Sequence, residues 1–212
     1  MNGKGRAMGD KTHLEKANDA LSAAKEAENA GKSKEATEKY NEAAKEFENA
    51  AGEAHEKAVQ DNKDLKYKAA KSSFKDAGNW YKAAGGILFD LAKNAKKLDG
   101  EGGSTEIYPK AAKAFEKAAK AYSAAADMGK QATPKDEKGE TATIRLDSAD
   151  AWLNAATAHL NAAEGDREYA KTVTGDKAKA EIAEAESAEA EAKIDIAGGR
   201  AEQRAAKEAL SD

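Results

Sequence analysis

The chain contains three histidines, His13, His55 and His159, and no cysteine. Any metal chemistry would therefore depend on histidine and carboxylate side chains. A di-iron site in a helical bundle requires a Glu-x-x-His motif on each of two helices. Position 52, three before His55, is glycine, and position 156, three before His159, is alanine. We therefore expect ordinary structural or surface histidines, and the sequence predicts no catalytic residue, no metal site and no cofactor.

Two other patterns could bind ions or phosphate, and both lack essential residues. The acidic segments 61–64 and 136–140 lack the alternating oxygen ligands and the central glycine of a calcium-binding loop. The glycine-rich segment 100–103 follows no predicted strand and lacks the lysine of a phosphate-binding loop. The sequence is therefore more typical of a non-enzymatic protein than of an enzyme.

A stripe of four lysines is the clearest candidate for a binding surface. Lys110, Lys113, Lys117 and Lys120 recur at helical spacing, which places them along one face of a helix. In a chain with a net charge of −4, such a stripe could bind an acidic partner, although charged stripes are often only solvated faces. Tyr81 directly follows a tryptophan, and adjacent helical side chains point about 100° apart, so we expect Tyr81 to be a partner-facing aromatic.

The composition predicts helices throughout. Alanine is the most frequent residue, 35% of residues are charged, and only two are proline. Alanine, glutamate and lysine all favour helix interiors. Alanine also makes up most of the apolar fraction, so helices can approach closely but bury little area per residue. The net negative charge argues against general nucleic-acid binding, which needs a basic surface.

Glycines divide the chain into predicted helices. The first helix begins at the capping box Thr12–Glu15 and ends at Gly31, and Gly52 can bend or end the second. In the aromatic-rich stretch 74–91, we expect Gly78 to close one helix and the next residue to cap another. The remaining predicted helices end near Leu98, at Gly129 and before Gly165, and a short helix covers 167–174. The predicted fold is all-α, with stacked antiparallel helical hairpins forming a solenoid or an extended bundle.

Three regions are expected along the chain. Residues 1–11 resemble a disordered tail, residues 12–172 carry the helical repeats, and residues 173–212 form a charged helical segment that Gly198 and Gly199 could interrupt. Because this last segment has few large apolar residues, the sequence leaves open whether it packs on the helical-repeat region.

Four stretches carry a repeated pattern, namely ENAGKSKEATEKYNEAA (28–44), FKDAGNWYKAA (74–84), AFEKAAKAYSAAADMG (114–129) and AWLNAATAHLNAAEGDREYA (151–170). This pattern resembles the tetratricopeptide group, and its helix lengths are most similar to the soluble NSF attachment proteins (SNAPs). This resemblance implies an adaptor that grips a SNARE helical bundle and recruits an AAA+ ATPase in vesicle trafficking. Residues 14–77 also resemble an MIT domain, a three-helix module that binds helical peptides.

The leading hypothesis is a cytoplasmic, non-enzymatic adaptor that binds a helical or acidic protein partner. No apolar run is long enough for a transmembrane helix, and peripheral membrane association stays open. The competing interpretation is a structural protein without a natural ligand. It would be either an engineered helical scaffold or a hydrophilic stress protein rich in alanine, glutamate and lysine.

Overall fold

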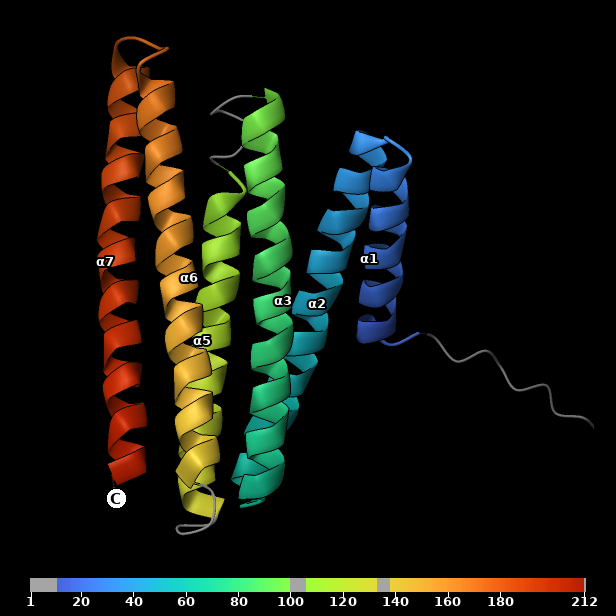
Figure 1. Ribbon diagram of the computed structural model, residues 1–212, viewed down its shortest axis with the longest axis vertical. Helices are drawn as coiled ribbons and strands as arrows, with labels where there is room; N and C mark the ends of the chain where they lie inside the picture. The colour runs from blue at the N-terminus through green and yellow to red at the C-terminus, as the bar shows by residue number, and fades with distance from the viewer. Residues whose placement is uncertain (1–10, 100–105, 133–137, 212) are drawn as a thin grey trace, which may run out of the picture.

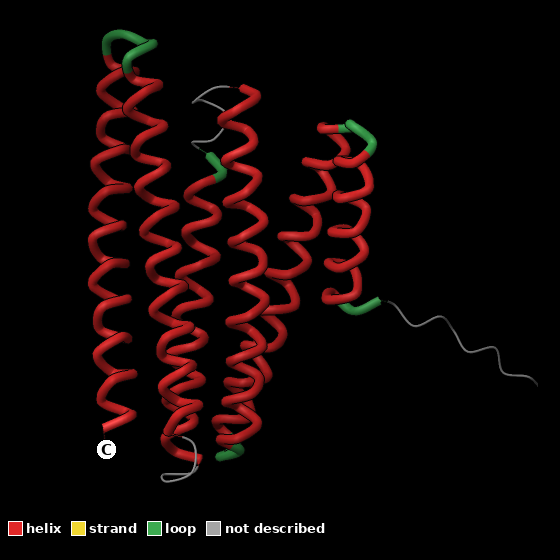
Figure 2. Tube along the Cα trace, viewed as in Figure 1, coloured by secondary structure: helices red, strands yellow, loops and turns green. Residues whose placement is uncertain are grey.

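The structure is a computed structural model, and it describes residues 11–99, 106–132 and 138–211. These residues form six α-helices, and no strand occurs among them (Figures 1 and 2). The helices are α1 (His13–Asn29), α2 (Ser33–Lys63), α3 (Tyr67–Asp99), α5 (Tyr108–Ala132), α6 (Lys138–Ala170) and α7 (Asp176–Ser211). Only residue 11 of the predicted tail is described, and the segments 100–105 and 133–137 lie outside the described residues.

Consecutive helices run antiparallel and pack side by side, so the chain forms a row from α1 to α7 (Figure 1). Each helix packs mainly on its neighbours in the sequence. The all-α, stacked arrangement predicted from the sequence is therefore confirmed. The charged segment after residue 173 forms one helix, α7, which packs along α6, and this settles the point that the sequence left open.

Three residues in the left-handed region mark the turns between helices. Gly31 follows α1 with φ of 72°, and Gly175 precedes α7 with φ of 69°. Between α2 and α3 the corresponding residue is Leu65, with φ of 60°, where a side chain is unfavourable. The Thr12 capping box at the start of α1 is present as predicted.

The turn predicted at Gly78 is wrong, because α3 continues through it without a break. A Cβ atom on Gly78 would lie 2.8 Å from ring carbons of Tyr122 on α5, and one on Gly85 would lie 2.8 Å from the ring of Phe115. The two glycines are seven residues apart, and so are the two aromatics on the antiparallel partner. Glycine is needed here for the close approach of two helices rather than for a turn.

Other predicted helix ends also lie inside helices. Gly129 is buried within α5, and a Cβ there would lie 3.0 Å from Oγ1 of Thr141. Gly165 lies within α6, so the predicted short helix 167–174 is the last turn of α6 and the loop that follows. Gly198 does not interrupt α7, and a Cβ atom on it would lie 3.1 Å from the indole of Trp152 on α6. Each of these glycines lies within a continuous helix.

Alanine fills most of the interior. Buried alanines from all six helices dominate the contact surfaces, and the largest side chains that are almost fully buried in the described part are Tyr122, Ile144 and Ser148. Small side chains let neighbouring helices approach closely, so each aromatic ring needs a matching gap on the facing helix. This explains why glycines on α3 and α7 lie opposite aromatic rings on α5 and α6.

Candidate functional site

The four lysines predicted as a binding stripe all lie on α5, but two of them make contacts within the protein. Lys117 places Nζ 3.5 Å from Oε1 of Glu48 on α2 and 5.3 Å from the ring centroid of Tyr81 on α3. Lys120 places Nζ 3.6 Å from Oε2 of Glu116 and 5.8 Å from the ring centroid of Trp152 on α6. These two lysines therefore reach toward opposite sides of α5.

Lys110 and Lys113 near the start of α5 are exposed, and neither forms an ion pair with any other described residue. Tyr81, the predicted partner-facing aromatic, is half-buried beneath Lys117, and burial raises the pKa of its hydroxyl. The structure thus leaves the first part of the predicted stripe open to solvent and ties the later part to the helix row.

A groove of about 600 Å³ separates the α1–α2 pair from the second half of α3. Tyr40 crosses one wall, where its hydroxyl donates to Glu28 at 2.7 Å. The groove lies beside the C-terminal half of α3. This part of α3 packs against the start of α5, where the rings of Phe89 and Tyr108 make an edge-to-face contact. The apolar part of its lining is Leu21, Ala83, Ile87 and Leu91.

A polar seam runs along the face of α6 that α5 and α7 cover. Four residues spaced seven apart lie on it, namely Arg145, Trp152, His159 and Asp166. Seven-residue spacing keeps side chains on one face of a helix. Arg145, His159 and Asp166 are buried, and Trp152 is half-buried. Polar groups buried in this way require partners from the neighbouring helices.

Arg145 has such partners from both sides. Its guanidinium donates to Ser123 Oγ and to Glu202 Oε2, each at 2.9 Å, and forms an ion pair with Asp127. Ser123 also donates to Glu202 at 2.7 Å. The network therefore joins α5, α6 and α7 at one end of the seam, as expected for a buried arginine.

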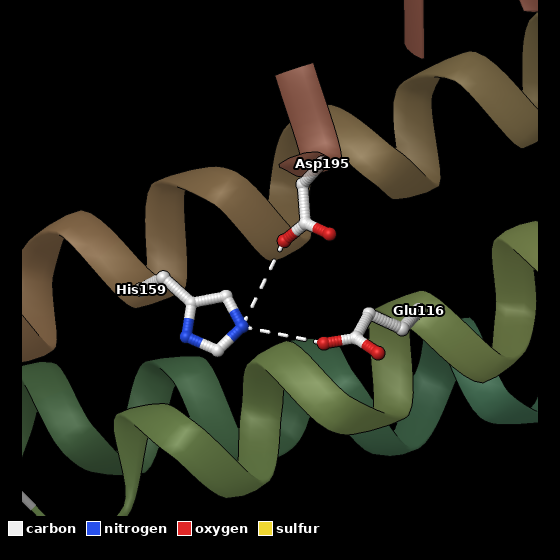
Figure 3. Close-up of side chains that lie close together, drawn as sticks. All are labelled: Glu116, His159 and Asp195. Atoms are coloured by element: carbon white, nitrogen blue, oxygen red, sulfur yellow. Dashed lines mark hydrogen bonds and ion pairs between the residues drawn. The ribbon is translucent and has the colours of Figure 1, made fainter. Parts of the chain in front are cut away.

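His159 lies about four turns further along α6 than Arg145, among carboxylates from both neighbouring helices. Its Nε2 is 3.3 Å from Oε1 of Glu116 on α5 and 3.7 Å from Oδ2 of Asp195 on α7 (Figure 3). Its Nδ1 is 3.1 Å from Oε2 of Glu191. The His159 and Asp195 side chains are almost fully buried, with 4% and 3% of each residue exposed.

The cluster contains more negative than positive groups, and this affects Asp195 most. Oδ2 of Asp195 is buried and forms no hydrogen bond with any described residue. Burial, together with the nearby carboxylates of Glu116 and Glu191, raises the pKa of Asp195 to about 6. Burial without compensation disfavours the ionised carboxylate, so the cluster is suited to holding a proton or a cation.

The sequence predicted His159 to be an ordinary histidine, and it missed Glu116, Asp195 and Glu191 altogether. The seven-residue spacing on α6 was a visible signal that these side chains share a face. The carboxylates that converge on His159 come from two other helices, at separations that no local motif encodes. Only the packing of α5 and α7 on α6 brings the group together.

Comparisons with known proteins assign the chain to no family. No protein-family model matches the chain, and no curated protein matches its sequence. Of the described helices, none contains a stretch that is both long and apolar enough to cross a membrane.

Proposed function

We propose that this protein is a non-enzymatic, cytoplasmic interaction protein that binds an acidic helical segment of another protein at the start of α5. The observation that carries the proposal is the pair Lys110 and Lys113. Both are exposed and without an ion pair among the described residues, in a chain with a net charge of −4. Opposite charges steer encounter and fix the register of a partner.

The neighbouring groove supports a helical rather than an extended partner. An amphipathic helix binds by laying its apolar face into a groove, and the groove beside α3 offers apolar side chains at the same end of the molecule as Lys110. Lys25 and Lys93 also line it, together with Glu28 and Asp90. Acidic residues on the polar face of such a helix would then meet lysines from three helices.

A role in vesicle trafficking rests on the sequence resemblance to SNAPs alone. Three of the four stretches that carried the repeat resemblance lie inside single helices, and only 28–44 spans a turn. The trafficking role is therefore a narrower proposal than protein binding. The competing interpretation is a helical scaffold or stress protein without a ligand, and it predicts no specific binding at α5.

The test reverses charge at the proposed surface and compares it with an equal change elsewhere. Lys110→Glu with Lys113→Glu is the test variant, and Lys45→Glu with Lys68→Glu is the control, because these lysines are also exposed and form no ion pair among the described residues. Fluorescence anisotropy would measure binding of a synthetic amphipathic helix with leucine on one face and glutamate on the other. Parallel affinity capture would compare the proteins retained by each variant.

We expect about tenfold weaker peptide binding for the test variant, since two surface ion pairs are replaced by repulsion. The control should bind like the wild type. Equal weakening in both variants would indicate non-specific charge attraction, and no binding by any of the proteins would support the scaffold interpretation.

A further inference from the structure

The cluster around His159 has the composition of a metal site. Glu116, His159 and Asp195 each direct one potential ligand atom to a common point, and these atoms lie within 4.8 Å of one another. They come from three helices, because α5 and α7 each pack on α6 (Figure 3). The site therefore lies on rigid elements rather than on a loop, which favours defined ligand geometry.

Asp195 supplies an independent reason to expect a ligand. Its Oδ2 atom is buried, lies 3.7 Å from His159 Nε2 and forms no hydrogen bond with any residue that the structure describes. A buried carboxylate oxygen without a hydrogen bond is destabilising, and buried charges in proteins are normally paired or bound to a metal. The unpartnered atom points toward the other two candidate ligands rather than toward solvent (Figure 3).

A third carboxylate, that of Glu191, lies close to the other ring nitrogen of His159. Its Oε2 lies 3.1 Å from Nδ1, on the far side of the ring from Glu116 and Asp195. Histidines that bind metals usually donate their other ring N–H to a carboxylate, which fixes the tautomer. With the proton on Nδ1, the ring nitrogen on the side of Glu191, the Nε2 lone pair faces two carboxylate oxygens.

We propose that Glu116 Oε1, His159 Nε2 and Asp195 Oδ2 bind one divalent first-row transition-metal ion, of which Zn²⁺ is the representative. Bonds of about 2.0–2.1 Å in a tetrahedral site place donor atoms about 3.3–3.4 Å apart. The observed separations from Nε2 are 3.3 and 3.7 Å, and all three atoms lie within 4.8 Å of one another, so the two carboxylates would move inward to bind the ion. Water would complete the four ligands.

The mixed nitrogen and oxygen ligands determine which ion is favoured. Imidazole suits zinc and its neighbours, whereas magnesium and calcium prefer oxygen ligands alone. The alternative occupant is a proton, which would make His159 an imidazolium between the carboxylates. That state needs no metal, so a measurement of metal binding distinguishes a bound proton from a bound metal ion.

Calorimetric titration of the metal-free chain, prepared without a histidine tag, tests the proposal. We expect one Zn²⁺ per chain and no competition from equal concentrations of Mg²⁺ or Ca²⁺. At a hundredfold excess of free Zn²⁺ over its Kd, the melting temperature should rise by about 5–10 °C. Absence of binding would overturn the proposal and leave the proton as the occupant.

Asp195→Asn is the decisive variant, and His13→Gln is its control. Asparagine removes the ligand charge and also relieves repulsion, so the metal-free variant should melt at the same or a higher temperature while binding Zn²⁺ at least tenfold more weakly. His13 also faces two carboxylates, Glu46 and Glu53, but its side chain is one-third exposed, and its loss should leave the affinity unchanged. Weakening by His13→Gln with no effect of Asp195→Asn would place the metal on α1 and α2 and refute the assignment.

Discussion

Nε2 of His159 on α6 lies 3.7 Å from Oδ2 of Asp195 on α7, and both side chains are almost completely buried. The pair belongs to the polar seam in which Arg145, Trp152, His159 and Asp166 share one face of α6. In a row of helices packed mainly through alanine, this seam is the place where buried charge concentrates.

Removing the buried arginine should strongly destabilise the row. Arg145→Met leaves Glu202, whose side chain is 13% exposed, without its main cationic partner. Breaking a buried ion pair from one side typically costs about 3–5 kcal/mol. Urea denaturation should show this loss, and adding Glu202→Met to the same chain should recover a large part of it. A single variant as stable as the wild type would mean that the network contributes nothing.

Two adjacent glycines in α3 should respond in opposite directions to alanine. A Cβ on Gly85 would lie 2.8 Å from the Phe115 ring, whereas one on Gly86 would meet no atom within 4 Å. Gly85→Ala should therefore lose about 1–2 kcal/mol, because overpacking outweighs the gain in helix propensity. Gly86→Ala should gain about 0.5–1 kcal/mol. Thermal and urea denaturation of both variants would measure this, and equal effects would contradict the close approach of α3 and α5.

The turn between α2 and α3 carries a residue in an unfavourable conformation. Leu65 has φ of 60° and is 70% exposed, so its side chain gains little from packing. The left-handed region costs a non-glycine residue roughly 1–2 kcal/mol, partly offset by the greater chain entropy of glycine when unfolded. Leu65→Gly should therefore increase the free energy of unfolding by up to about 1 kcal/mol. A decrease would show that the turn has a different conformation.

The contribution of Asp166 to stability should fall as the pH rises from about 4 to 6. Burial and the carboxylates of Glu184 and Glu181 raise its pKa from an ordinary 3.8 to about 6. In this window the folded chain retains a proton that the unfolded chain has released, so raising the pH favours unfolding. The stabilisation is complete below pH 4 and is lost above pH 6.

Asp166→Asn should reduce this slope and raise the melting temperature at pH 7, by about 2–4 °C for each kcal/mol gained. The control is Asp150→Asn, an exposed position on the same helix, which should leave both unchanged. An unaltered pH profile in Asp166→Asn would assign the slope to other groups.

Local signals in the sequence were sufficient for some features. The composition predicted the all-α fold, and Thr12, Glu15 and Gly31 correctly marked the ends of α1. The turn predicted at Gly78 was wrong because a glycine in an amphipathic pattern can indicate either a turn or a close contact between helices. The residue that decides between them, Tyr122, lies on another helix.

The candidate site was also predicted only in part, because some of its contacts join different helices. The lysine stripe was visible because its members follow one helical period, and the sequence placed all four on one helix. The sequence could not show that Lys117 and Lys120 reach rings on neighbouring helices. The group around His159 was missed because its carboxylates come from helices whose register is set by packing and not by a local motif.

Nuclear magnetic resonance of the imidazole nitrogens, with and without one equivalent of Zn²⁺, tests the arrangement around His159 most directly. The chain has only three histidines, and His159→Gln would identify the relevant signals. We predict that Zn²⁺ shifts Nε2 of His159 while the rings of His13 and His55 stay unchanged, and that Asp195→Asn abolishes the shift. A His159 signal that does not respond to Zn²⁺, or that responds equally in Asp195→Asn, would contradict the account.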